Sequence, residues 1–166
     1  ASLFKLTGIQ KGLNPGSSAD DFEKFEEQKG VGLSNWMTLP PFKGKSLDQE
    51  CGPEASLDTQ PWIKKPDWRV GYVINLTMPD NSLQYCYCKL YVDAPKTVTA
   101  YLGSDDGIAV YLNGKKIMSN NASRGVDANQ DKAQLPLVKG LNHLLLKIHN
   151  GGGGSGVYFS LDEKPK

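Results

Sequence analysis

The sequence predicts an all-β fold, a jelly-roll β-sandwich, and three observations lead to this prediction. From Trp36 onward, short segments rich in β-branched and aromatic residues follow one another at close spacing. Glycine (18 residues) and proline (10 residues) are frequent, as is typical of many strands joined by turns. Asn113-Gly114 lies between two apolar segments and is a strong signal for a hairpin. Together these features favour a sandwich or a jelly roll.

The individual strands are expected where apolar or alternating segments lie between turn residues. Alternation along residues 83–92 places Cys86 and Cys88 on one face of a strand and the neighbouring tyrosines on the other face. The predicted strands are residues 70–76, 83–92, 97–102, 108–112, 115–118, 134–138, 142–148 and 156–161.

The first 35 residues differ from the rest of the chain. Ser and Asp residues at 17–21 can cap a helix over 22–29, acidic residues fill its first turns, and Gly30 can end it. This helix would carry few apolar side chains. We therefore expect residues 1–35 to form a short helical or extended appendage, and residues 36–166 to form the sandwich module.

Length and charge exclude several classes of protein. A chain of 166 residues suffices for one domain. The formal net charge is +1 and the lysine runs are short, so no nucleic-acid partner is expected. No apolar run approaches the roughly 20 residues that a membrane-spanning helix needs, so no membrane span is expected.

The three cysteines allow two interpretations. Cys51 could form a disulfide with Cys86 or Cys88, which would suit an oxidising compartment and leave one thiol over. Alternatively, all three are buried thiols that pack as small apolar groups. A zinc site is not favoured, because a Cys-x-Cys pair with one distant cysteine and only two histidines is a weak zinc-binding pattern.

Two polar stretches, residues 103–107 and 120–131, carry the densest set of candidate functional residues. The hairpin at residues 108–118 sends both stretches to the same end of the sandwich, and the glycine-rich loop 150–155 is expected to join them. Loops gathered at one end of a rigid sandwich are frequent binding sites. Asn121 and Asn150 are candidate ligand-binding residues in these loops.

Calcium is the metal that these loops suggest. Asp127, Asn129 and Asp131 offer a side-chain oxygen at every second position, and calcium takes six to eight oxygen ligands. The helix-loop-helix calcium hand is excluded, because its required glycine and final glutamate are missing. A different site that includes Asp105 or Asp106 remains open. The alternative is that these residues form turns and surface hydrogen bonds.

Arg124 lies in the same stretch and has two possible roles. Its guanidinium could bind a carboxylate, a sulfate or sugar hydroxyls in a ligand. It could instead pair with Asp131 and brace the long loop.

Trp36, Trp62 and Trp68 are candidate aromatic platforms for a sugar ring. The alternative is that Trp62 and Trp68 pack a loop against the sandwich.

An enzyme is not expected. His143 and His149 flank a leucine-rich strand without a nucleophile motif. Asp105 and Asp106 are adjacent, and adjacent carboxyls do not flank one substrate bond as an acid–base pair. No catalytic residues are assigned.

Several stretches of the chain carry a family resemblance. They are residues 102–115, 119–125, 127–131, 139–152 and 158–159. Residues 36–161 resemble a galactose-binding-like β-sandwich module that is appended to large secreted proteins of planctomycete-type bacteria. The stretch 104–107 with the following Asn-Gly-Lys hairpin also resembles the PA14 lectin domain. In calcium-dependent PA14 domains, paired aspartates hold the ion that contacts sugar, and Asp105 and Asp106 match that pair.

This resemblance implies a non-catalytic carbohydrate-binding module of a secreted or cell-surface protein, with a polysaccharide or glycan partner and calcium assistance. One alternative is a structural or assembly module of an extracellular complex that contacts neighbouring subunits through residues 1–35. A further alternative is an accessory domain of a hydrolase or lyase.

Overall fold

The structure is a computed structural model that describes residues 23–165, and these residues contain thirteen β-strands and no helix. The all-β prediction is therefore confirmed. The strands are β1 (Glu26–Gln28), β2 (Val31–Leu33), β3 (Trp36–Thr38), β4 (Phe42–Lys43), β5 (Ile63–Lys65), β6 (Ile74–Asn75), β7 (Ser82–Val92), β8 (Lys96–Asp105), β9 (Gly107–Leu112), β10 (Lys115–Asn120), β11 (Asp131–Leu137), β12 (Gly140–Asn150) and β13 (Gly156–Ser160).

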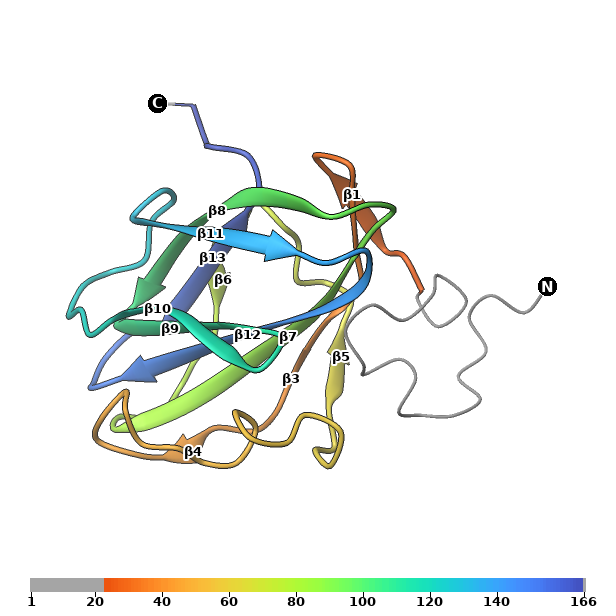
Figure 1. The fold of residues 1–166 in the computed structure, drawn as a ribbon. Coiled ribbons are helices and arrows are strands. Elements are labelled where there is room, and N and C mark those ends of the chain that lie inside the picture. The colour runs from red at the N-terminus through yellow and green to blue at the C-terminus, as the bar shows by residue number, and fades with distance from the viewer. Residues whose placement is uncertain (1–22, 166) are drawn as a thin grey trace.

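The strands form two antiparallel sheets that stack as a sandwich (Figure 1). The larger sheet has the order β1-β2-β7-β12-β9-β10, with β3 and β4 also paired to β7 and β5 paired to β3. The smaller sheet has the order β11-β8-β13-β6. Between β8 and β13, the smaller sheet contains β8, β11 and β13 and the larger sheet contains β9, β10 and β12, so several connections cross from one sheet to the other.

The hydrophobic core lies between the two sheets. Cys86 and Cys88 of β7 point into it, and so do Leu144, Leu146 and Ile148 of β12. The tyrosines of β7, Tyr85 and Tyr87, lie in a different cluster on the opposite face. The predicted alternation of cysteines and tyrosines is thus confirmed, because successive side chains of a strand point to opposite faces.

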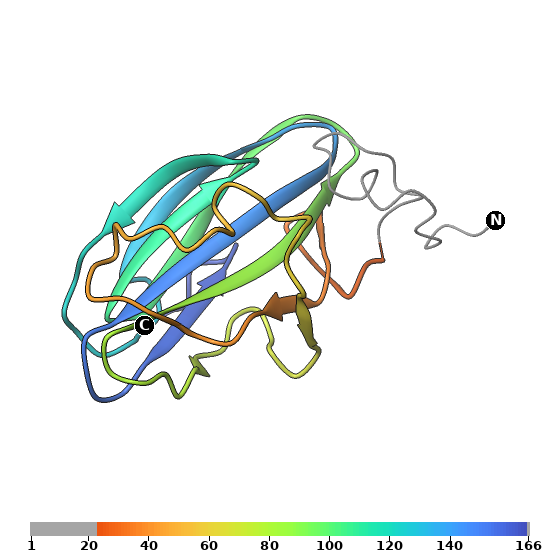
Figure 2. The same ribbon diagram turned by 90° about the horizontal axis from the view of Figure 1, so that it is seen from below.

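The outer face of the larger sheet is also covered, by the long connection around residues 44–62, which crosses it in Figure 2. Leu47, Cys51 and Leu57 of this connection pack against tyrosines of the sheet and Leu145 of β12. Every residue of β12 is buried as a result. A strand covered on both faces needs no polar alternation, which accounts for three consecutive leucines in it.

The helix expected over residues 22–29 is wrong for the described part of that segment. Residues 26–28 form strand β1, and a turn at Lys29 (φ 54°) and Gly30 (φ 77°) leads into β2. Val31 and Leu33 are fully buried in the core, and β2 pairs with β7. Burial of these two apolar side chains outweighs the helix signals before them. Residues 26–33 therefore belong to the larger sheet, and residues 1–22 lie outside the described part.

The strand expected over residues 70–76 is confirmed only at β6. The chain turns at Gly71 (φ 87°), whose N–H donates to the carbonyl of Phe159 at 2.8 Å. Tyr72 and Val73 that follow are 68% and 50% exposed. These apolar residues predict a strand from the sequence, but only Ile74 and Asn75 pair with β13, at the edge of the smaller sheet.

All three cysteines are free thiols. Cys51 packs on the outer face of the larger sheet, whereas Cys86 and Cys88 lie on its inner face. The sheet itself separates Cys51 from the other two, so the disulfide alternative is wrong. Burial raises the pKa of the Cys86 and Cys88 thiols to about 12.

Candidate functional site

Four connections between the sheets meet at one end of the sandwich. They join β6 to β7, β8 to β9, β10 to β11 and β12 to β13 (Figure 1). The Arg124 N–H donates to Asp106 Oδ1 at 3.2 Å, and the Gly151 N–H donates to Asp106 Oδ2 at 2.9 Å. The two polar stretches and the glycine-rich loop predicted to converge therefore do so, around one carboxylate.

Asp106 is held in place from several sides. Its N–H donates to the His149 carbonyl at 2.8 Å, and its own carbonyl accepts the Ser104 hydroxyl at 2.7 Å. The peptide bond that joins it to Asp105 is cis. Backbone and carboxylate are both fixed by neighbours, so Asp106 is a rigid part of this end.

Asp105 adjoins this fixed carboxylate and is half-buried. Burial, the side-chain hydrogen bond with Asp106 and the charge of Asp106 together raise the pKa of the Asp105 carboxyl above its ordinary value of 3.8. Two adjacent ionised carboxylates repel each other, and a bound cation would relieve that repulsion.

Arg124 braces the long loop. Its guanidinium forms an ion pair with Asp131 and also donates to the carbonyl (3.2 Å) and hydroxyl (3.0 Å) of Ser104. Asn120 donates to the other oxygen of Asp131 at 2.9 Å. These contacts agree with the alternative that Arg124 pairs with Asp131 and braces the loop. A ligand-binding role for Arg124 or Asp131 stays a prediction.

The loop between β10 and β11 lies directly on Gly103. A Cβ atom at this position would come within 1.7 Å of the Asp127 carbonyl oxygen, so no other residue fits without displacing the loop. Gln130 Oε1 accepts the neighbouring Ser104 N–H at 2.9 Å and its amide donates to the Gly125 carbonyl at 2.7 Å. The missing side chain of one glycine thus allows the loop to approach the aspartate pair.

Asp127 and Asn129, both predicted as metal ligands, make local contacts. Asp127 Oδ1 accepts the Ala128 N–H, and the Asn129 amide exchanges two hydrogen bonds with the backbone of Lys164. Over residues 23–165, no three Asp, Glu, His or Cys side chains are placed to hold a metal ion together. Any calcium site at this end would need amide or carbonyl oxygens as well.

Asn150 offers such an oxygen. This side chain is fully buried, and its Nδ2 donates to the carbonyls of Met78 (3.1 Å), Pro79 (3.1 Å) and Gly153 (3.3 Å). Its Oδ1 is buried without a hydrogen-bond partner. A buried acceptor left unpaired is costly, and a water molecule or a cation would satisfy it. Asn121 is exposed, beside Gly107.

Sequence reasoning missed Asp80, which lies in the connection between β6 and β7. Its Oδ1 accepts the Gly153 N–H at 3.1 Å, and the next residue, Asn81, donates its N–H to the Gly151 carbonyl at 3.2 Å. The run Pro79-Asp80-Asn81-Ser82 between two expected strands is a turn signal that could have placed this loop at the same end.

Trp62 and Trp68 make the contacts of packing residues. The Trp62 indole N–H donates to the Leu57 carbonyl at 2.7 Å, and its ring lies 5.0 Å from Tyr87 on the outer face. Trp68 is 8% exposed and belongs to the core cluster between the sheets. Neither contact involves the loops around Asp106, so a platform role for them at that end is not supported.

A second polar cluster, also missed, lies under the connection of residues 44–62. Glu54 forms an ion pair with Lys147 of β12 at 2.7 Å and accepts a hydrogen bond from the Tyr85 hydroxyl at 2.5 Å. The side chains of Glu54 and Lys147 are at most 5% exposed. Burial alone raises the pKa of Glu54, but the bonds from Lys147 and Tyr85 outweigh it and lower the pKa below 4.5. Burial also raises the pKa of Tyr85.

A comparison with protein-family models finds no match, and a comparison with curated proteins finds none either. Among solved structures, the chain is similar to a PA14 sugar-binding domain from an RTX adhesin, at 18% identity and a TM-score of 0.34 over 45% of this chain and 44% of that one. It is also similar to the PA14 domain of the MpAFP antifreeze protein, at 12% identity and a TM-score of 0.47 over 85% of this chain and 89% of that one.

A β-glucosidase from Kluyveromyces marxianus is similar at 11% identity and a TM-score of 0.47, over 81% of this chain but only 17% of the enzyme. The chain thus spans less than half of the adhesin domain and a small part of the glucosidase. All three TM-scores lie below 0.5. Within residues 23–165, no helix is long and apolar enough to cross a membrane.

Proposed function

We propose that this chain is a non-catalytic carbohydrate-binding module of a secreted or cell-surface protein, and that calcium assists binding at the end formed by the Asp105-Asp106 pair. One observation carries the proposal. Two adjacent carboxylates lie where four inter-sheet connections meet, and the neighbouring Asn150 has a buried side-chain oxygen without a hydrogen-bond partner. The resemblance of residues 104–107 to the PA14 lectin stretch supports the same assignment.

The donors at this end fit calcium better than other metals. Carboxylate and amide oxygens are hard ligands, and calcium accepts them in flexible geometry. Asp105, Asp106 and Asn150 are the residues that would hold the ion. When bound, calcium would neutralise the paired carboxylates and offer coordination positions to sugar hydroxyls. The surrounding loops orient the carboxylates, because backbone N–H groups of Arg124 and Gly151 hold Asp106 in place.

Calcium titration by calorimetry, with Asp105→Asn and Asp106→Asn, tests the site. We expect each variant to bind calcium at least tenfold more weakly, since one charged ligand is lost (about 1.4 kcal/mol for a factor of ten). Asp127→Asn is the matched control, because that carboxylate is used locally. Equal calcium binding by the wild type and both variants would refute the assignment.

Glycan binding is measured separately, on a polysaccharide affinity gel run with calcium and with EDTA. We expect retention in calcium, and reduced retention in EDTA and in the Asp106→Asn variant. A chain that no polysaccharide or glycan retains under either condition would not be a carbohydrate-binding module.

A further inference from the structure

A second concave site lies away from the aspartate pair, at the edge between the two sheets. It is a pocket of about 400 Å³, lined among others by Asp67, Trp68, Arg69, Tyr72 and Asn75. The segment that forms it runs from the end of β5 to β6 and closes the open edge of the sandwich. None of the contacts described around Asp106 involves this pocket.

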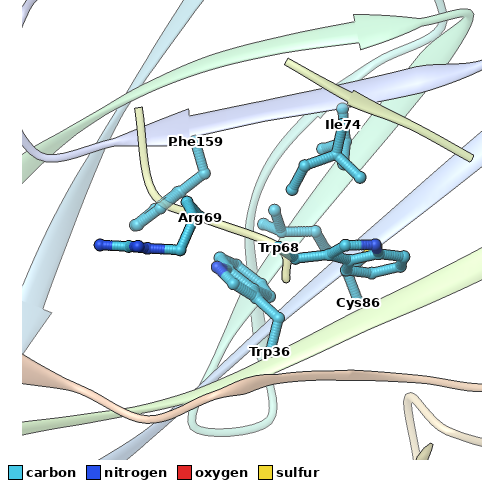
Figure 3. A pocket seen from close by; sticks show the side chains of 8 residues that line it. Trp36, Trp68, Arg69, Ile74, Cys86 and Phe159 are labelled. Carbon is cyan, nitrogen blue, oxygen red and sulfur yellow. The ribbon is translucent and has the colours of Figure 1, made fainter. Parts of the chain in front are cut away.

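The floor of the pocket is rigid and apolar. Trp68 also lines a second, smaller apolar cavity together with Trp36, Phe159 and Cys86, as Figure 3 shows. Trp36 and Phe159 form an edge-to-face pair with ring centroids 5.5 Å apart, which joins the two sheets at this point. The floor is therefore preformed, and binding on it would cost little ordering.

The walls of the pocket are fixed as well. Arg69 donates two hydrogen bonds of 3.3 Å to the Glu26 carboxylate of β1, and its guanidinium lies 5.4 Å from the Phe25 ring centroid. Gly71 is tied to the Phe159 carbonyl. These contacts hold the segment that leads directly into Tyr72.

Packing does not explain the rim of the pocket. Tyr72 is 68% exposed, so most of the ring is in water although a tyrosine of this fold is otherwise mostly buried. Asn75 uses its Oδ1 to accept the Thr77 N–H at 3.1 Å, which orients the amide and leaves its NH₂ group as a donor. The exposed Asp67 adds an acceptor. An aromatic face beside a carboxylate and an amide provides apolar contact and directional hydrogen bonds together.

We propose that this pocket is a second glycan-binding site, independent of calcium, in which a pyranose ring lies on the Tyr72 ring and its hydroxyls bond to Asp67 and Asn75. The inference extends the proposed function to a second site. A sugar fits better than a protein surface, because the site is a small concave pocket of mixed polarity with a single exposed aromatic ring. Calcium is not required, since a neutral hydroxyl needs only one acceptor and one donor here.

The test is isothermal calorimetry of the full chain in excess EDTA, with soluble cello-, xylo-, manno- and chito-oligosaccharides as probes. We expect one class to bind, Tyr72→Ala to weaken it about tenfold or more, and Tyr72→Phe to retain it, because the ring does the stacking. Tyr101→Ala, at a half-buried tyrosine on the smaller sheet, is the matched control and should bind as the wild type does. Circular dichroism checks that each variant is folded.

The outcomes separate this inference from the proposed function. If EDTA abolishes glycan binding and Tyr72→Ala leaves it unchanged, the second site is overturned and the calcium-assisted site is retained. Binding in EDTA that depends on Tyr72 but not on Asp106 supports the second site, and the calcium titration described above decides separately whether the first site exists. No binding by any probe or gel overturns both. A change in mass by light scattering on Tyr72→Ala, without any sugar response, would make the rim a contact between protein copies and also overturn the inference.

Discussion

The two faces of the larger sheet are built from alternate residues of the same strands, yet they are stabilised differently. On the inner face, Leu144, Leu146 and Ile148 meet the smaller sheet in a core without charged groups. On the outer face, the intervening residue Lys147 is fully buried beneath the connection of residues 44–62, which contains no strand. The inner face depends on non-directional apolar burial, whereas the outer face adds directional polar contacts to its apolar packing.

The difference shows how a long connection can be held on a sheet with little regular structure of its own. Glu54 reaches down to Lys147 and to the Tyr85 hydroxyl, and the Cys51 N–H donates to that same hydroxyl at 3.3 Å. One loop carboxylate thus fixes where the connection sits. A buried ion pair contributes little net stability against an apolar pair of the same size, but it specifies one position.

The largest effect is expected from breaking this ion pair on one side. Lys147→Met leaves the Glu54 carboxylate buried without a cation, and we expect it to lower the free energy of unfolding by about 3–5 kcal/mol. The double variant Lys147→Met with Glu54→Leu removes both charges and should recover most of the loss. Urea unfolding of the three proteins measures it, and equal losses in the single and double variants would contradict the role of the pair.

A smaller difference is expected between two neighbouring leucines on opposite faces. Leu146→Ala leaves a cavity between two sheets that cannot approach each other, and we expect a loss of about 3 kcal/mol. Leu145→Ala lies under the connection, which can partly collapse onto the space, so we expect about 2 kcal/mol. The same unfolding experiment compares them. A larger loss for Leu145 would mean that the outer cover is as rigid as the core.

The sequence predicts those parts of the fold that depend on local periodicity. Alternation placed Cys86 and Tyr87 on opposite faces, and the hairpin at Asn113-Gly114 carried the polar stretches to one end of the sandwich. Contacts between distant segments leave no such pattern. From the sequence alone, a lysine within a leucine-rich strand is predicted to face solvent. Only the structure shows that Lys147 forms a buried ion pair with Glu54, 93 positions earlier.

The same reason explains the misplaced N-terminal helix and the incomplete site. Acidic residues before Gly30 are compatible with a helix, but residues 26–28 pair with β2, which in turn pairs with the distant strand β7. Asp106 could be found from its neighbours in sequence, whereas the unpaired oxygen of Asn150 depends on how its amide is used by Met78 and Pro79.

The pH dependence of stability should also separate the two faces. The pKa of Glu54 lies below 4.5 in the folded protein, so its contribution is present above that pH and is lost as the pH falls through the lowered value. We expect Glu54→Gln to flatten the acid side of the stability profile, and the inner-face variant Leu146→Ala to shift the profile down without changing its shape. Thermal unfolding between pH 3 and 7 measures both. Parallel profiles for wild type and Glu54→Gln would contradict the assignment.

The smallest effect concerns how readily a reagent reaches the three thiols in the wild-type protein. Cys51 lies partly exposed in the outer cover, whereas Cys86 and Cys88 are at most 1% exposed in the core, and burial holds the pKa of each core thiol near 12. A thiol reacts as the thiolate, so iodoacetamide should modify Cys51 in the native protein and the core pair only after global unfolding. Lys147→Met should accelerate modification of the core pair, because a lower free energy of unfolding raises the population of unfolded protein, whereas Cys51 is already accessible in the native protein. Mass spectrometry of timed samples gives the three rates. Modification of all three thiols at one common rate would show that the cover and the core open together, and that the two faces form a single cooperative unit.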